Sequence, residues 1–104
     1  MPDKVKTKLE RHAEICSMLN DIYRRKNADY GDSFGDTFQK LGIISAVTRI
    51  TDKVNRLQAL CIHDAQVKDE SICDTLLDLA NYAIMSVIEM QLADLITTKT
   101  EETK

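Results

Sequence analysis

Three side chains in the C-terminal third of the sequence are spaced so that they could act together. Asp74, Asp78 and Asn81 stand four and three residues apart, and Glu70 lies four residues before Asp74. On a helix such residues are neighbours along one ridge. Mg²⁺ binds a few protein carboxylates and shares its remaining positions with waters and substrate phosphates. The spacing therefore indicates either part of a metal site or an acidic face exposed to water.

A second group of side chains could bind anions. Arg49, Lys53 and Arg56, called the basic row below, follow a similar spacing, and Asp52 lies beside them. Arginine binds phosphate through paired hydrogen bonds and lysine binds it as a point charge, while Asp52 could add a metal ligand. The alternative is that the basic row pairs with the carboxylates of the later helix. Both interpretations require the two helices to be neighbours.

The segment from Lys26 to Phe34 could also contact a ligand. Gly31 would let the backbone approach the ligand closely, and Tyr30 or Phe34 could stack on a planar group such as a base. The alternative is an ordinary turn between two helices, in which Phe34 fills the core.

Helix-forming residues dominate the sequence, and apolar positions recur every three to four residues. This pattern predicts an all-α antiparallel bundle of three to four helices. Gly42 is expected to divide two of them, with Asp36 or Thr37 capping the shorter one. The expected helices cover about residues 5–27, 37–41 and 43–63, and a last one runs from a cap at Asp69 or Ser71 to about residue 96. The expected connections are a turn-rich loop over 27–36 and a polar segment over 64–68.

Two of these helices have apolar faces that bear on packing. The last one carries apolar residues around roughly half of its circumference, which is more than two partner helices in so small a chain would cover. We therefore expect self-association, as a homodimer or homotetramer, to complete the bundle. The third helix is expected to bury one apolar row, made of Ile43, Val47, Ile50, Val54, Leu57 and Cys61.

Size and composition bound the class of protein. The 104 residues are expected to form one domain over 1–96, followed by a polar tail over 97–104. A net charge of −3 disfavours nucleic-acid binding. No apolar run reaches the roughly 18 residues of a membrane span, so none is expected, and the polar first residues are not expected to act as a secretion signal. We expect a cytoplasmic protein whose three cysteines, Cys16, Cys61 and Cys73, are reduced thiols in the core. The two histidines, His12 and His63, are expected at the surface or at helix ends.

Three blocks of residues together resemble a small phage and bacterial family. The blocks are Lys26-x-x-Asp29-Tyr30-Gly31-Asp32-Ser33-Phe34, Arg49-Ile-x-Asp52-Lys53-x-x-Arg56-Leu57 and Asp69-Glu70-Ser71-x-x-Asp74-Thr-Leu-x-Asp78-Leu-Ala-Asn81-Tyr82. They look like the nucleotide modification associated domain 1 family, which is similar to the all-α, MazG-like nucleoside triphosphate pyrophosphohydrolases. The resemblance covers about residues 22 to 90.

The resemblance implies a Mg²⁺-dependent enzyme that binds a standard or modified nucleotide and cleaves its α–β phosphate link, in the bacterial host cell if a phage encodes it. The metal would neutralise phosphate charge and activate water. Carried over to this sequence, the catalytic residues are Asp52, Asp74 and Asp78, and Glu70 joins them as a metal ligand. The nucleotide-binding residues are Lys26, Tyr30, Gly31, Arg49, Lys53, Arg56, Asn81 and Tyr82.

One position departs from the pattern of the hydrolases. Where they carry two glutamates three residues apart, this chain carries Arg49 and Asp52. A site with fewer carboxylates and more bases would still bind a nucleotide. Two alternatives to hydrolysis therefore stay open: a protein that binds or sequesters a nucleotide without cleaving it, and a helical oligomerisation module without a small ligand.

Overall fold

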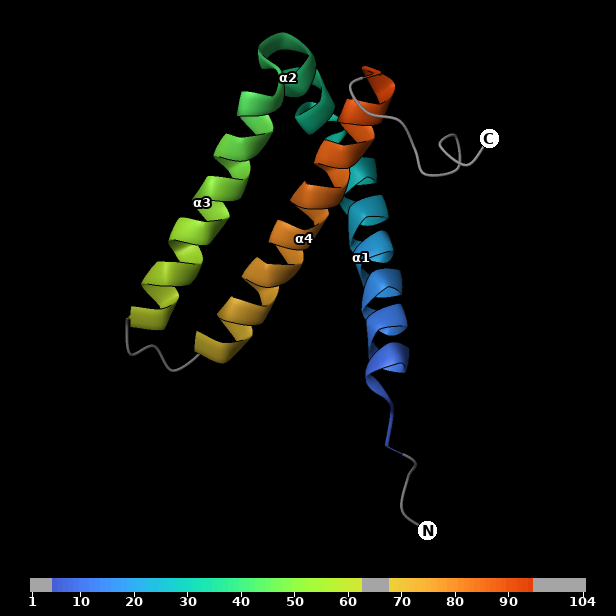
Figure 1. Cartoon of the computed structure of the whole chain (residues 1–104), viewed down its shortest axis with the longest axis vertical. Helices are drawn as coiled ribbons and strands as arrows, with labels where there is room; N and C mark the ends of the chain where they lie inside the picture. Colours follow the sequence, from blue (N-terminus) through green and yellow to red (C-terminus); the bar gives the residue numbers. More distant parts are fainter. Residues whose placement is uncertain (1–4, 63–67, 95–104) are drawn as a thin grey trace. The chain divides into compact units, whose positions relative to one another are not determined.

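A computed structural model describes residues 5–62 and 68–94, and within these ranges it contains four α-helices and no strand. The predicted all-α class is confirmed. The chain divides into two compact units, Met1–Gly31 and Asp32–Lys104, and whether they make one domain stays a prediction. The helices, labelled in Figure 1, are α1 (Lys8–Tyr30), α2 (Ser33–Leu41), α3 (Ile43–Ile62) and α4 (Lys68–Leu92).

The first unit contains α1, whose start is fixed by a capping box. The Thr7 hydroxyl accepts a hydrogen bond from the Glu10 backbone N–H, and the Glu10 carboxylate accepts one from the Thr7 backbone N–H. These bonds satisfy two N–H groups that lack partners within the helix. The predicted start near residue 5 is therefore wrong by three residues. The predicted end at residue 27 is also wrong, because α1 continues to Tyr30 before Gly31 takes a positive φ of 72°.

The second unit begins with α2, which starts earlier than the sequence indicated. Its N-cap is Asp32, whose carboxylate accepts a hydrogen bond from the Gly35 N–H at 3.1 Å. A Cβ at Gly35 would collide with that carboxylate, so the glycine makes the close approach possible. The predicted cap at Asp36 or Thr37 is thus wrong. The predicted loop over 27–36 shortens to Gly31 and Asp32.

Gly42 divides α2 from α3, as predicted. Its φ of 79° lies in the left-handed region that glycine adopts without a steric penalty. Its N–H donates to the Phe38 carbonyl at 2.7 Å, which ends α2. The chain therefore turns within a single residue, and α3 begins at once.

The helices of the second unit pack around a small aromatic core. In Figure 1, α3 and α4 run antiparallel, with α2 near the end where α3 begins and α4 finishes. Phe34, Phe38 and Ala46 are buried there. Partly buried side chains of α4 pack against them, namely Tyr82, Met85 and Met90.

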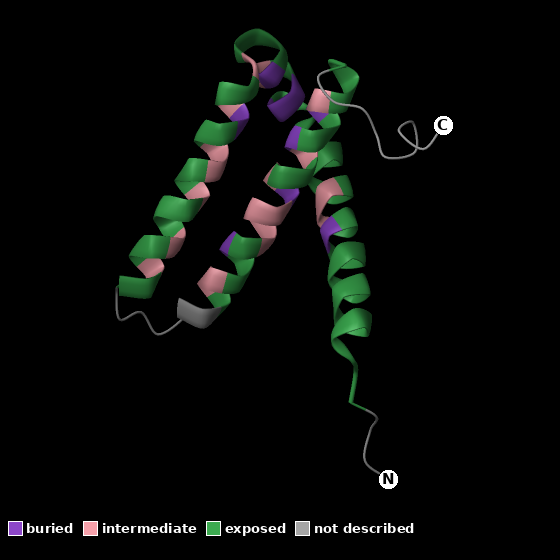
Figure 2. Cartoon of the chain, viewed as in Figure 1, coloured by how far each residue is buried: buried purple, intermediate pink, exposed green. Residues whose placement is uncertain are grey.

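The apolar row expected to be buried on α3 is not the face that packs. Figure 2 shows the less exposed residues of α3 on the side facing α4. That face contains Ala46, Arg49 and Lys53, so the helix is rotated relative to the expected orientation. Ile50 and Leu57 are half-buried, but the prediction is wrong for the exposed members Ile43, Val47, Val54 and Cys61. The three cysteines are free and exposed, so their expected place in the core is also wrong.

The last helix, α4, retains an apolar surface in this single chain. By length and composition alone, Glu70–Leu92 could cross a membrane, with a mean hydropathy of 1.3. That is weak evidence, because core helices have the same composition and charged groups such as Asp78 are costly in hydrocarbon. Self-association stays a prediction, and residues 95–104 lie outside the described ranges. The exposed apolar residues of α4 are Leu76, Ile84, Val87, Ile88 and Leu92.

Candidate functional site

Lys53 of α3 and Asp78 of α4 meet where the two helices pack. The Lys53 Nζ lies 3.3 Å from the Asp78 Oδ2, and the two side chains are 25% and 31% exposed. The same ammonium lies 5.8 Å from the centre of the Tyr82 ring, within the range of a cation–π interaction. Lys53 is therefore held between a carboxylate and an aromatic face, in a partly dehydrated position.

One turn along α3, Arg56 makes a second polar contact with α4. Its Nε donates to the Thr75 Oγ1 at 3.3 Å, and that hydroxyl donates to the Ser71 carbonyl at 2.7 Å. Among the side chains that the structure describes, those of residues 5–62 and 70–94, Arg56 forms no ion pair, and Arg49 forms neither an ion pair nor a side-chain hydrogen bond. The expected alternative of internal pairing thus applies to Lys53 but not to the two arginines.

The predicted metal ligands are not brought together in this chain. Asp52, Glu70 and Asp74 are exposed, while Asp78 is half-buried beside Lys53. Across the described part of the chain, no three His, Cys, Asp or Glu side chains form a group that could hold a metal ion. The Lys53 ammonium forms a salt bridge with the Asp78 carboxylate, which was expected to hold the metal. The binding of magnesium stays a prediction.

The face of α4 that turns inward differs from the ridge that the sequence emphasised. Asn81 is buried and Asp74 is exposed. The polar side chains that meet α2 and α3 are instead Thr75, Asp78 and Tyr82, with the buried Glu89 two turns further on. Thr75 and Glu89 were missed by the sequence analysis. Their spacing from Asp78 and Tyr82 was a usable signal, because all four lie on one face of a helix.

The predicted ligand-contacting segment is divided between the two units. Lys26, Tyr30 and Gly31 belong to the first, where the Tyr30 side chain is 77% exposed at the end of α1. Phe34 belongs to the second, where its ring stacks on Tyr82 with centroids 5.8 Å apart. The alternative that Phe34 fills the core is therefore confirmed.

A thiol–imidazole pair on α1 was not anticipated from the sequence. The Cys16 Sγ lies 3.7 Å from the His12 Nδ1, one helical turn away, and both residues are exposed. His12 is thus on the surface, as predicted, whereas His63 lies outside the described residues.

The match to a known family spans both polar groups on α3 and α4. The family model described as nucleotide modification associated domain 1 matches residues 26–90. This chain belongs to that family. The nucleotide modification associated domain 1 match includes the basic row, Asp78, Tyr82 and Glu89. No curated protein and no solved structure matches the chain. The further likeness to MazG-like hydrolases stays a prediction.

Proposed function

We propose that this protein binds a nucleotide and holds its phosphates with the basic row of α3. The observation that carries the proposal is the setting of Lys53. Its ammonium is held at the helix interface by Asp78 and Tyr82. Arg49 and Arg56 lie one turn to either side, and neither is neutralised by a carboxylate of the described residues.

The contacts of the basic row are of a kind that a phosphate could displace. Strong charge-assisted hydrogen bonds between ammonium and carboxylate are about 2.7–2.9 Å long, whereas Lys53 and Asp78 are separated by 3.3 Å. Partly exposed ion pairs contribute little stability, typically below about 1 kcal/mol. A phosphate group carries more charge than one carboxylate and also accepts paired hydrogen bonds from arginine. Ligand binding would therefore replace a weak contact with several stronger ones.

The family description supports a nucleotide as the ligand, since it associates the domain with nucleotide modification. Binding is proposed ahead of cleavage for a physical reason. Hydrolysis of the predicted type depends on a metal that neutralises charge and activates water, and the described residues of one chain gather no metal-binding group. Mg²⁺-dependent pyrophosphohydrolysis is therefore the second candidate.

Calorimetric titration with nucleoside mono-, di- and triphosphates, each with chelator and with Mg²⁺, tests the proposal. Lys53→Met and Arg56→Met are each expected to weaken binding roughly 10- to 100-fold, because hydrogen bonds to charged groups contribute about 1.5–3 kcal/mol. Lys40→Met is the matched control, since it removes the same charge from an exposed position on α2. Equal affinities for the wild type and both basic-row variants would overturn the proposal.

The nucleotide recovered after titration separates binding from catalysis. Intact nucleotide in the presence of Mg²⁺ selects the binding protein. Release of pyrophosphate that disappears in Asp74→Asn and Asp78→Asn would select the hydrolase and bring the metal back into the site. An oligomerisation module without a ligand would give no heat with any nucleotide of the panel.

A further inference from the structure

A pocket lies at the opposite end of the second unit from the Arg56–Thr75 contact. Its volume is about 370 Å³, which is within the usual range for small-molecule sites. It lies where α2 ends, α3 begins and α4 completes its last turns. The residues that line it are Phe38, Gln39, Gly42, Glu89, Leu92 and Ala93.

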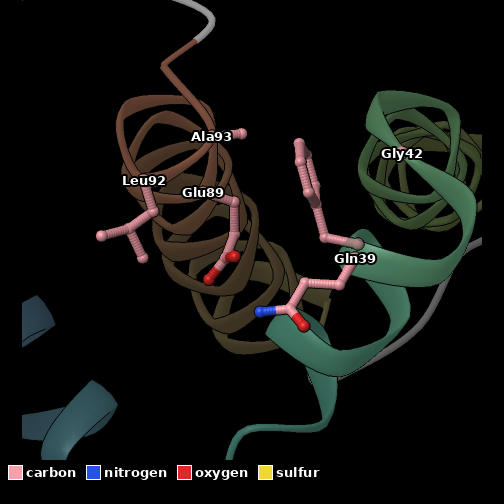
Figure 3. Close-up of a pocket in the computed structure, with 6 residues that line it drawn as sticks. Gln39, Gly42, Glu89, Leu92 and Ala93 are labelled. Atoms are coloured by element: carbon pink, nitrogen blue, oxygen red, sulfur yellow. The ribbon is translucent and has the colours of Figure 1, made fainter.

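Glu89 is the unusual member of this pocket. It is only 9% exposed, yet its carboxyl group forms no hydrogen bond or ion pair with any of the residues that the structure describes. Figure 3 shows the Glu89 carboxyl and the Gln39 amide extending toward one another across the pocket. No side-chain oxygen or nitrogen of the described residues is both shut off from solvent and without a hydrogen bond, so the Glu89 carboxyl oxygens still reach the water in the pocket. A ligand of opposite charge would replace that water and supply the partner that Glu89 lacks among the described residues.

The charges around Glu89 indicate that a ligand of this pocket would be a cation. Burial raises the pKa of the Glu89 carboxyl, and repulsion from the Asp32 and Asp36 carboxylates raises it further. Asp32 caps α2, and Asp36 lies in its first turn. Three carboxyl groups thus create a negative potential at this end of the unit, which excludes anions such as phosphate and attracts cations.

The lining of the pocket favours an organic cation over a metal ion. Asp32, Asp36 and Glu89 do not converge into a group that could ligate a metal, since the described residues contain no such group. Phe38, Leu92 and Ala93 instead provide apolar contact for a hydrocarbon chain. An ammonium group has three N–H donors. The Glu89 carboxylate can accept one of these hydrogen bonds, and the exposed Gln39 can turn its amide so that the oxygen accepts another.

We propose that this pocket binds a primary alkylammonium group, with Glu89 as its counter-ion and Gln39 as its second acceptor. The site is separate from the nucleotide-binding surface and does not depend on it. Glu89 lies three turns beyond Asp78 on α4, or about 16 Å along the helix axis.

The test is a titration of the full chain with n-butylammonium chloride, followed by the backbone amide resonances in NMR spectra. The expected result is saturable shifts at Gln39, Gly42 and Glu89. n-Butanol, which has the same chain without the charge, is expected to bind at least tenfold more weakly. Glu89→Gln, which keeps the shape of the side chain, should weaken n-butylammonium at least tenfold. Asp21→Asn removes one exposed carboxylate from α1 and should leave the affinity unchanged.

Three results would overturn the proposal. Equal binding of n-butanol would show that the pocket recognises only the hydrocarbon chain. Saturation of the same resonances by MgCl₂ at lower concentration than n-butylammonium would make the site a metal site. An unchanged affinity in Glu89→Gln would remove Glu89 from the site, and a spectrum of Glu89→Gln matching the wild type elsewhere keeps this comparison independent of folding.

Discussion

The Phe34 ring stacks on the Tyr82 ring, with centroids 5.8 Å apart and planes inclined by 22°. This contact connects the first turn of α2 to the middle of α4. Tyr82 also lies 5.8 Å from the Lys53 ammonium, so one side chain links the aromatic core to the basic row. A change at Tyr82 is therefore expected to affect both the packing of the aromatic core and the position of Lys53, the side chain proposed to hold phosphate.

Replacing Tyr82 tests this coupling. Tyr82→Phe keeps the ring and should change the free energy of unfolding by less than about 0.5 kcal/mol, because the Tyr82 hydroxyl forms no hydrogen bond with the described residues. Tyr82→Leu loses the stacked pair, which contributes about 0.5–1.5 kcal/mol beyond burial. It should also weaken nucleotide binding several-fold through a less restrained Lys53. Urea denaturation and calorimetry measure the two effects, and similar results for both variants would contradict the coupling.

Asp78→Asn distinguishes a resting partner of Lys53 from a metal ligand. If Asp78 competes with phosphate for the Lys53 ammonium, the variant should bind nucleotide more tightly than the wild type, with or without chelator. If Asp78 holds Mg²⁺, the variant should lose affinity, and only when Mg²⁺ is present. Calorimetry in both conditions gives opposite signs for the two roles. Thr51→Val, an exposed change on α3, serves as the control.

The sequence predicted the helical class and the division at Gly42, because periodicity and backbone freedom are local properties. It did not predict which face of α3 packs. The apolar residues Ile43, Val47 and Val54 are exposed, whereas Arg49 and Lys53 are half-buried and Lys53 contacts Asp78 of α4. The rotation of a helix depends on its partners, and here Ala46 allows close packing beside Phe34 and Phe38. A single row of apolar residues cannot specify that choice.

The candidate site was predicted only in part for a related reason. Lys53, Arg56, Asp78 and Tyr82 were expected to act together, and the structure brings them to one interface. Glu89 was overlooked because the search followed the spacing from Asp74, although Glu89 shares one face of α4 with Asp78 and Tyr82. The Asp32 and Asp36 carboxylates that raise its pKa are distant in sequence, so only the packed unit shows them near Glu89.

The close approach of Gly35 to the Asp32 cap gives a prediction about local stability. Gly35→Ala places a Cβ against the Asp32 carboxylate and should disrupt the N-cap, at a cost of about 1 kcal/mol in the free energy of unfolding. Asp32→Ala removes the same cap, so the double variant should be less destabilised than the sum of the single ones. Ser33→Ala is the control at the next, exposed position. Additive losses in urea denaturation would show that the two residues act separately.

Glu89→Gln should alter the pH dependence of stability in a defined direction. Burial and the Asp32 and Asp36 carboxylates raise the pKa of Glu89 above its ordinary value of 4.5. Well below pH 4.5 the carboxyl is protonated in both folded and unfolded chains, so it adds no pH dependence to the free energy of unfolding. As the pH rises, the unfolded chain loses this proton first, so the folded state binds more protons and its stability falls until the folded pKa is passed.

The glutamine variant has no such proton, so its advantage over the wild type should be absent near pH 4, grow as the pH rises, and stay constant at higher pH. Urea midpoints measured from pH 4 to pH 8 give this difference curve directly. Asp21→Asn, at an exposed position on α1, should show no comparable rise. A wild-type advantage over Glu89→Gln that increases with pH would mean that ionised Glu89 gains a cationic partner within the protein, and the proposed counter-ion site for an external amine would then be occupied from inside.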